Sequence, residues 1–167
     1  MRAYYRNGTT VRPLADGDTR TVTALFERLG ERSRRHRFAG PKPRLSQREL
    51  EALARADGDH HALVAYVEDD PEPAGMAWLV RDRRTADVAV AVVDAHQGRG
   101  IGSLLTEMLA ADARAAGITT LTATVGADNP AATALLARVP ARRSGTWSGS
   151  QLEVVLELRE SDAEPQT

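Results

Sequence analysis

Three glycines cluster where an apolar strand is expected to lead into a helix. Gly98, Gly100 and Gly102 follow the apolar run 86–93, and an amphipathic segment begins at Ile101. The first backbone N–H groups of a helix have no partner within the helix, and they lie at the positive end of its dipole. Glycine also lets a ligand approach the backbone closely. These residue types at this spacing predict a phosphate-binding loop.

Two familiar phosphate loops differ from this one at single positions. The Walker A loop needs a lysine between its last glycine and the Ser or Thr, but Ser103 follows Gly102 directly. The dinucleotide fingerprint needs a third glycine where this chain has Ser103. The pattern that remains is Gln97-x-x-Gly100-x-Gly102 after a valine-rich strand. A tight turn that uses its glycines only for packing is the alternative interpretation.

Composition limits the classes of protein to which the chain can belong. Its 167 residues suffice for one domain with a core, and no apolar run approaches the roughly 20 residues of a membrane span. The N-terminal residues lack the apolar core of a signal peptide. The absence of cysteine excludes disulfides, thiolate metal sites and an acyl-cysteine intermediate, and it suits a cytoplasmic protein. A net charge of −1 argues against nucleic acid as a partner.

The glycine-rich loop must be positioned by an α/β domain, which hydrophobic periodicity predicts over residues 9–158. The strands before the loop are joined by turns too short for crossover helices, so they should form an antiparallel meander. A helix connects the loop to the next strand, so the pairing there should be parallel. The expected strands are 9–14, 61–67, 75–80, 87–93, 121–125, 142–147 and 152–158, and the expected helices are 16–30, 46–57, 101–116 and 128–139.

These elements predict a mixed, twisted central sheet flanked by about four helices. Asp16 is the expected N-cap of the first helix, and Ser46 and Glu49 form a capping box at the start of the second. Residues 1–8 are expected to be a loose lead-in, and residues 159–167 a polar C-terminal tail.

The order of elements and the pattern Gln97-x-x-Gly100-x-Gly102 closely resemble the GNAT superfamily of N-acetyltransferases across residues 9–158. The resemblance implies the GNAT fold, acetyl-CoA as donor, and direct attack by an amine in a ternary complex. A closer likeness is to the stand-alone form of the bacterial protein lysine acetyltransferases, so a protein lysine is the first acceptor expected. A small amine, such as an antibiotic or a polyamine, is the alternative. The passages that carry the closer likeness are 25–29, 33–38, 84–93 and 97–102.

The resemblance also implies which residues bind acetyl-CoA. In many GNAT enzymes the strand before the loop bulges, and its backbone binds the pantetheine arm and polarises the thioester carbonyl. The diphosphate rests on the loop backbone, and an asparagine that opens the next helix contacts the arm. On this sequence the cofactor-binding residues are Val92, Val93, Gln97, Gly98, Arg99, Gly100, Ile101, Gly102, Ser103 and Asn129.

Simpler interpretations stay open for several of these polar residues. Arg99 is either a charge-assisted contact to the diphosphate or an exposed side chain. Asn129 either contacts the cofactor arm or caps its helix, and both roles are compatible. His96 adjoins the loop and could touch the nucleotide, but it is expected to face solvent. No metal is expected, because His60 and His61 have no acidic or histidine partner at metal-ligand spacing.

Asp87 is the candidate catalytic residue. An amine must be neutral to attack a thioester, and deprotonating a lysine at pH 7 costs about 4–5 kcal/mol, so a general base is useful. Asp87 is the only ionisable residue in the apolar run, and in the protein lysine acetyltransferases a glutamate at the matching position is the base. Aspartate is shorter by one methylene, so a bridging water is expected. The alternative is a strand residue paired with Arg83 or Arg84.

The chain departs from the family on the helix that follows Asn129. Many members carry a tyrosine seven residues later, poised to protonate the departing thiolate, but this chain has Leu136. Because a thiol has a pKa near 8.5, leaving as thiolate costs only roughly 2 kcal/mol, so the loss should slow the reaction rather than stop it. A weakly catalytic acyl-CoA sensor or accessory domain is therefore a second hypothesis, and a nucleotide-binding regulator is a third.

The arginine-rich run 32–44 lies where GNAT enzymes place acceptor-site loops. It could recognise an acidic protein surface or the 3′-phosphate of the cofactor, and a solvated basic segment is the simpler interpretation. The expected assembly is a monomer or a homodimer.

Overall fold

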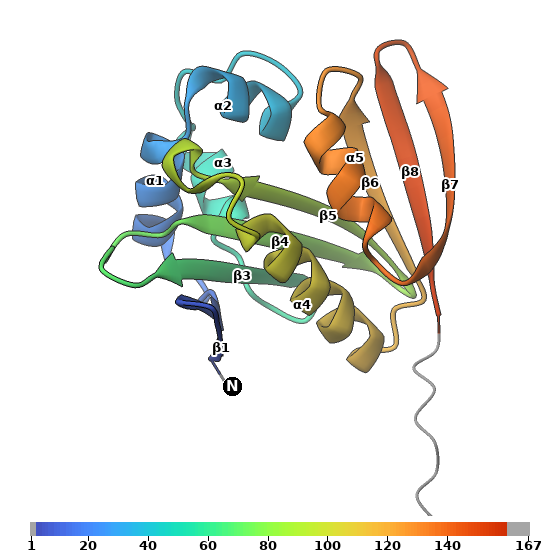
Figure 1. Ribbon diagram of the computed structural model, residues 1–167, viewed down its shortest axis with the longest axis horizontal. Coiled ribbons are helices and arrows are strands. Elements are labelled where there is room, and N and C mark those ends of the chain that lie inside the picture. Colours follow the sequence, from blue (N-terminus) through green and yellow to red (C-terminus); the bar gives the residue numbers. More distant parts are fainter. Residues whose placement is uncertain (1–2, 160–167) are drawn as a thin grey trace, which may run out of the picture.

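One mixed sheet runs through residues 3–159, the part of the chain that the computed structural model describes (Figure 1). Its strand order is β1-β2-β3-β4-β5-β6-β8-β7. The strands are β1 (Tyr4–Arg6), β2 (Thr9–Pro13), β3 (His60–Val67), β4 (Gly75–Asp82), β5 (Thr85–Val92), β6 (Thr120–Gly126), β7 (Ala141–Ser148) and β8 (Gln151–Leu158). The helices are α1 (Thr19–Arg28), α2 (Glu31–Phe38), α3 (Gln47–Leu53), α4 (Ile101–Ala115) and α5 (Pro130–Ala137), with a 3-10 turn η1 (Asp94–His96).

The strand pairing confirms the predicted fold class. Neighbouring strands are antiparallel from β1 through β5 and again in β6-β8-β7, whereas β5 and β6 are parallel. That parallel pairing is short, because it joins only residues 85–87 of β5 to residues 120–122 of β6. The two strands therefore part after their first three residues.

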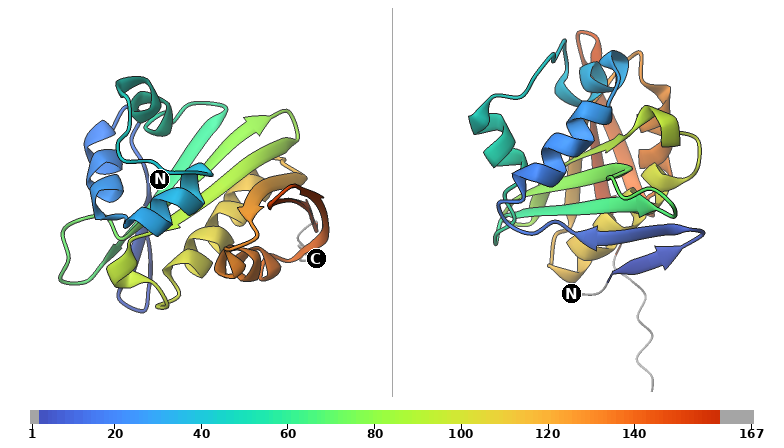
Figure 2. Two further views of the ribbon diagram at one scale, coloured as in Figure 1. Left: turned by 90° about the horizontal axis from the view of Figure 1, so that it is seen from above. Right: turned by 90° about the vertical axis from the view of Figure 1, so that its left-hand side faces the viewer.

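Helices cover both faces of the sheet (Figure 2). Side chains of successive strand residues point to opposite faces of the sheet. Gly75 and Trp78 of β4, three positions apart, therefore lie on opposite faces. Gly75 faces Ile101 and Leu105 of α4. The Trp78 indole donates a hydrogen bond to the carbonyl of Leu53 at the end of α3 (3.1 Å). The helices α4 and α5 therefore lie on one face, and α2 and α3 on the other.

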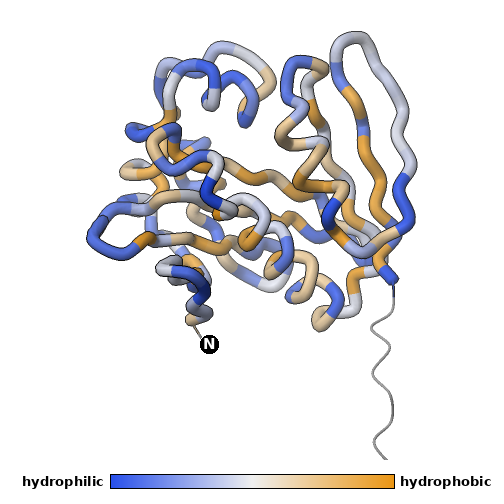
Figure 3. Tube along the Cα trace, in the orientation of Figure 1, coloured by the Kyte–Doolittle hydropathy of each residue, from blue (hydrophilic) through white to orange (hydrophobic). Residues whose placement is uncertain are grey.

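The core is continuous along the central strands, which are the most hydrophobic part of the trace in Figure 3. Apolar side chains of the sheet pack there against the helices on its two faces and exclude water, which stabilises the fold by roughly 25 cal/mol for each Å² buried. Fully buried members of this core include Leu63, Met76, Leu105, Leu109 and Leu156.

Two elements were not predicted. Residues 31–38 form the helix α2, so the structure has five α-helices in its described part rather than about four. The sequence of α2, Glu-Arg-Ser-Arg-Arg-His-Arg-Phe, has no apolar stripe from which periodicity could predict a helix. Residues 4–6 of the expected lead-in form β1, which pairs with β2.

Of the two helix N-caps predicted in the first 50 residues, the one at α1 is wrong and the one at α3 is confirmed. Asp18 caps α1 by accepting from the Thr21 N–H (3.0 Å), whereas Asp16 accepts from the backbone of Ala56 (2.8 Å). The capping box of Ser46 and Glu49 is present at the start of α3. The domain bounds 9–158 stay a prediction, and residues 160–167 of the expected tail lie outside the described part.

Replacing Gly75 with valine should destabilise the protein, because α4 lies directly on that backbone. A Cβ at this position would be 3.1 Å from both the Ala91 carbonyl oxygen and Leu105 Cδ1. We expect Gly75→Val to lower the free energy of unfolding by about 1–3 kcal/mol, measured by urea denaturation. Gly58→Val is the control, because a Cβ there meets nothing within 4 Å. Equal effects of the two changes would contradict the close packing of α4 on β4.

Candidate functional site

The glycine-rich loop leaves the N-terminus of α4 open. Gly98 and Gly100 have φ angles of 75° and 82°, in the left-handed region that favours glycine, and a Cβ on either would meet nothing within 4 Å. Gly100 is the N-cap and offers no capping side chain. Only Gly102 has a packing role, since a Cβ there would be 3.0 Å from Leu135 of α5 and 3.5 Å from Val92. The interpretation that all three glycines serve packing is therefore wrong.

Backbone donors accumulate at this open end. The N–H of Leu104 is the first of α4 to donate backward, to the carbonyl of Gly100 (3.0 Å). Within residues 3–159, no acceptor is found for the N–H groups of residues 98–103. Ile101 contributes only its backbone, because its side chain is in the core. Free donors at the positive end of a helix dipole, with no side chain in front of them, fit a diphosphate.

Gln97 differs from the rest of the loop because both its backbone N–H and its side-chain amide have hydrogen-bond acceptors. Its backbone N–H donates to the Asp94 carbonyl (3.3 Å), so that group is not free for a phosphate. Its side-chain amide donates to the Val92 carbonyl (3.0 Å) and to the Ser33 hydroxyl of α2 (3.0 Å). The Asp94 carboxylate accepts from the same hydroxyl (2.7 Å) and from the Gly30 N–H (3.2 Å). Gln97 therefore joins the loop to β5 and to the start of α2.

Arg99 ends a chain of polar contacts that leads back to the β3–β4 loop. Its guanidinium donates to Nδ1 of His96 (2.7 Å), and Nε2 of His96 lies 2.9 Å from Asp70, which also pairs with Arg28 (2.7 Å). These partners fix the tautomer with the proton on Nε2. The prediction that His96 faces solvent is wrong, because its side chain is only 13% exposed. Hydrogen bonds from His96 and then Arg28 lower the pKa of Asp70 to about 2.

The gap between β5 and β6 is the second part of the site. The pairing of β4 with β5 is regular, so the bulge expected at Val92 and Val93 is not formed. Val93 donates its N–H to the Ala74 carbonyl (2.9 Å), and its own carbonyl accepts from His96 (3.0 Å), so neither group is free for a ligand. Because successive strand residues point their backbone groups to opposite sides, Val90 and Val92 direct theirs toward the gap. The Val92 carbonyl there already accepts from the Gln97 amide, and its N–H is left for a ligand. Beyond Asp87 these backbone groups have no pairing partner on β6.

The start of α5 forms one side of this gap. Asn129 caps the helix by accepting from the Ala132 N–H (3.2 Å), as one of its two interpretations expected. That bond uses the amide oxygen, so the amide nitrogen is still available to a ligand. Leu136 is buried in the core, and it therefore places no polar group in the gap.

Asp87 lies at the point where β5 and β6 part. It is exposed on β5, and one carboxylate oxygen accepts from the hydroxyl of Thr122 (3.1 Å) on β6. It forms no ion pair with Arg83 or Arg84. Asp87 pairs with Val80 in the register, so it lies on the same face as Trp78, toward α2 and away from α4. A carboxylate with one oxygen held and one free can accept a proton from a group in the gap.

Sequence reasoning missed several residues of the site because they come from distant segments. Thr122, Ser33 and Asp94 have ordinary residue types for their strand or loop and carried no motif. Arg138 of the segment after α5 donates to the hydroxyl of Ser103 (3.1 Å), beside the open end of α4. No motif in the sequence connects these residues.

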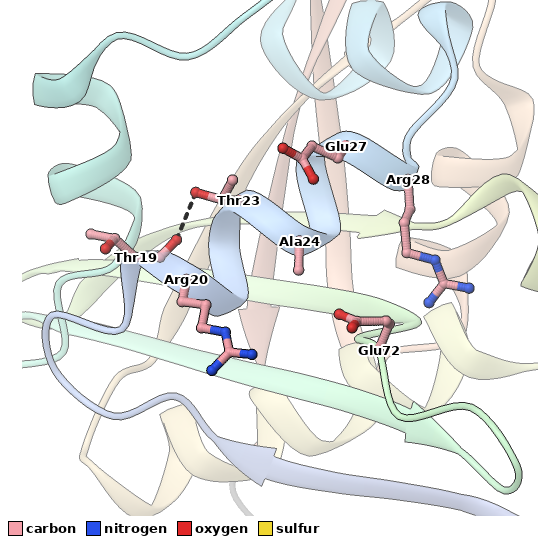
Figure 4. A pocket seen from close by; sticks show the side chains of 7 residues that line it. All are labelled: Thr19, Arg20, Thr23, Ala24, Glu27, Arg28 and Glu72. Atoms are coloured by element: carbon pink, nitrogen blue, oxygen red, sulfur yellow. Dashed lines mark hydrogen bonds between the residues drawn. The ribbon is translucent and has the colours of Figure 1, made fainter.

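Residues 3–159 contain neither a cluster of metal ligands nor a helix that could span a membrane. No group of three or more His, Cys, Asp or Glu side chains is arranged to hold a metal ion there, and none of the helices there has the length and apolar character needed to cross a bilayer. A surface hollow of about 450 Å³ lies along α1 and reaches Glu72 of the β3–β4 loop (Figure 4). It contains none of the predicted site residues.

The glycine loop, the gap and Asp87 together form the arrangement expected of an acetyltransferase. The profile of the Acetyltransferase (GNAT) family matches residues 24–139, more than half of the chain. The chain belongs to the GNAT family. The predicted fold and enzyme class are thereby confirmed. Acetyl-CoA as co-substrate is confirmed too, since similar proteins have been solved with acetyl-CoA or CoA.

Solved structures of other GNAT proteins are similar over nearly the whole acetyltransferase. The GNAT domain of S. lividans PAT is 27% identical, with a TM-score of 0.81 and 90% of each chain covered. The Salmonella typhimurium protein yncA, solved with acetyl-CoA, is 21% identical, with a TM-score of 0.71 over 96% of this chain and 100% of that one. Spermidine N-acetyltransferase from Vibrio cholerae, in complex with CoA and spermine, is 19% identical, with a TM-score of 0.69 over 92% and 97%.

Placing a side chain on Gly100 should weaken acetyl-CoA binding. Alanine at a φ of 82° costs about 1–2 kcal/mol, and the loop would relax from its present geometry. We expect Gly100→Ala to raise the Kd for acetyl-CoA roughly tenfold in calorimetry. Gly17→Ala is the matched control, with a φ of 77° and open space around the Cβ. If both variants bind acetyl-CoA like the wild type, the loop geometry does not govern binding.

The stability of this acetyltransferase should depend on Asp70 at low pH. The pKa of Asp70 is lowered from 3.8 to about 2, so its stabilising effect is present above pH 4 and is lost as the pH falls toward 2. We expect Asp70→Asn to lower Tm near pH 5 and to have little effect near pH 2. Asp69→Asn, at the neighbouring position, is the control. A Tm difference that does not change with pH would contradict the prediction.

Proposed function

We propose that this acetyltransferase transfers acetyl from acetyl-CoA to a primary amine by direct attack in a ternary complex. The carrying observation is the gap that begins beside Asp87 and ends at the open N-terminus of α4. The diphosphate binds the backbone donors of residues 98–103, with the Arg99 guanidinium nearby. The pantetheine arm lies between β5 and β6, against the backbone of Val92 and the amide of Asn129.

Asp87 is the proposed base in this reaction. Its free carboxylate oxygen takes a proton from the attacking nitrogen, directly or through one water, while Thr122 holds the other oxygen. The nitrogen attacks the thioester carbonyl, the C–N bond forms, and the C–S bond breaks. No acyl-enzyme is needed, and the chain has no cysteine to form one. The products are the acetylated amine and coenzyme A.

The leaving group departs as a thiolate and takes its proton from water or from the substrate ammonium. Leu136 is buried in the position of the family's tyrosine, so it supplies none. Since departure as thiolate costs only roughly 2 kcal/mol near neutral pH, we expect a slower enzyme rather than an inactive one.

A protein lysine is the proposed acceptor, in a cytoplasmic setting. The supporting observations are the likeness of residues 25–29, 33–38, 84–93 and 97–102 to the protein lysine acetyltransferases and the similarity to the S. lividans PAT domain. A small amine is the alternative, which the fold shared with the spermidine N-acetyltransferase permits. Mass spectrometry of candidate proteins and small amines, after incubation with acetyl-CoA, would identify the acceptor. Double-displacement kinetics with an acetylated enzyme would contradict direct attack.

An acyl-CoA-binding sensor with little turnover is the second candidate, and Leu136 is the observation that favours it. Tight acetyl-CoA binding in calorimetry, together with no transfer to a broad panel of amines, would support the sensor. Measurable transfer to a protein lysine would exclude it.

Replacing Asp87 with asparagine tests the proposed base. We expect Asp87→Asn to lower kcat roughly 100-fold or more, because asparagine cannot accept the proton, and to leave the Kd for acetyl-CoA close to the wild-type value. Asp82→Asn, on the neighbouring strand, is the control. An unchanged kcat in Asp87→Asn would remove Asp87 from the mechanism.

A further inference from the structure

Arg37 of α2 is a cation without a partner beside the proposed base. No hydrogen bond or ion pair joins its guanidinium to any of residues 3–159. Its Nε is sealed from solvent and has no acceptor, whereas the two terminal nitrogens still reach the surface. A guanidinium carries five N–H donors, and leaving such donors unpaired while partly buried is costly. Native proteins seldom keep this arrangement without a use for it.

Aromatic rings hold the Arg37 side chain in place. Its guanidinium carbon lies 4.5 Å from the centre of the Trp78 ring and 4.9 Å from that of Phe38. Trp78 is itself fixed by its hydrogen bond to the Leu53 carbonyl (3.1 Å). Burial lowers the pKa of Arg37 to about 10, against the opposing effect of the Asp87 charge, so the side chain stays cationic near neutral pH. The side chain is therefore positioned as well as charged.

The neighbouring charged groups do not neutralise this cation. Asp87 makes its hydrogen bond to Thr122 and forms no ion pair with Arg37. Lys42 lies over the other ring of the pair, 5.8 Å from the centre of Phe38, and is already paired with Glu49. The site thus presents a cation and a carboxylate oxygen on the same face of the sheet, the face away from α4. An acceptor that satisfies both must carry an anion beside its amine.

We propose that Arg37 determines acceptor specificity by binding a carboxylate that lies next to the amine to be acetylated. For a protein lysine, this carboxylate belongs to an aspartate or glutamate flanking the lysine. The two terminal nitrogens of the guanidinium bind both carboxylate oxygens, while the amine is directed to Asp87. The inference rests on the proposed function and adds the class of acceptor to it.

Paired peptides test this inference with the full-length protein. The two peptides are identical except for glutamate or glutamine beside a single lysine, and kcat/KM is measured for each with acetyl-CoA. We expect the wild type to prefer the glutamate peptide roughly tenfold, as a charge-assisted pair suggests. Arg37→Met, which keeps an apolar contact to Trp78, should bring the ratio to about one. Arg37→Lys, which keeps the charge but loses the fork, should give an intermediate ratio.

The control is Arg35→Met on the same helix, whose exposed guanidinium pairs with Glu31 (3.5 Å). It should keep the wild-type ratio. Circular dichroism and the Kd for acetyl-CoA show whether each variant is folded. If Arg37→Met does not fold, the ratio measured with Arg37→Lys tests the role of Arg37. A wild-type ratio near one, or the wild-type ratio preserved in both Arg37 variants, would overturn the inference.

The outcome also separates this inference from the proposed function. If the wild type acetylates neither peptide but does acetylate small amines, the proposed lysine acceptor is wrong. In that case kcat/KM is compared between an amino acid and its amide, which differ in the free carboxylate. A preference for the free carboxylate that Arg37→Met abolishes then supports Arg37, and equal rates overturn its role. Absence of transfer to every amine, with acetyl-CoA still bound, would overturn both proposals.

Discussion

The parting of β5 and β6 after Asp87 and Thr122 is the constraint on which the rest of the structure depends. Parallel strands in a sheet normally satisfy each other's backbone groups, so two that separate leave donors and acceptors facing an empty strip. That strip has a fixed width and direction because β5 is held by β4 and β6 by β8. The helices α4 and α5 begin at its two sides, and α2 covers the opposite face. The strip is therefore bordered by backbone groups whose positions the neighbouring strands fix.

The loop beside this strip could be predicted because its signals are local. Glycines at 98, 100 and 102, a valine-rich strand before them and an apolar helix face after them lie within a short stretch of sequence. The sequence alone could not show which role each glycine has. In the structure Gly98 and Gly100 adopt positive φ angles, whereas Gly102 allows close packing against Leu135. The capping box at Ser46 is equally local, and it was also predicted correctly.

The predictions failed where distant segments meet. His96 contacts Asp70, 26 residues earlier, and Gln97 contacts Ser33, 64 residues earlier, so neither environment is visible in the neighbouring sequence. The bulge at Val92 and Val93 was carried over by resemblance, but β5 pairs regularly with β4 up to Val92, and Val93 donates to the Ala74 carbonyl. Asp87 stood out as the one charge in an apolar strand, whereas Thr122 and Arg37 have types that are common on strands and basic helices. Proximity in three dimensions, rather than residue type, gives these two their importance.

The helix α2 depends on a neighbour for its existence. Eight residues without an apolar face are too few to remain helical alone in water. The carboxylate of Asp94, from the turn after β5, holds the start of α2 by accepting hydrogen bonds from the Gly30 N–H and from the Ser33 hydroxyl. This segment should therefore order only once the central strands have assembled, and it should be among the first to exchange its amide hydrogens with solvent. The order of α2 thus depends on the turn that precedes the glycine-rich loop.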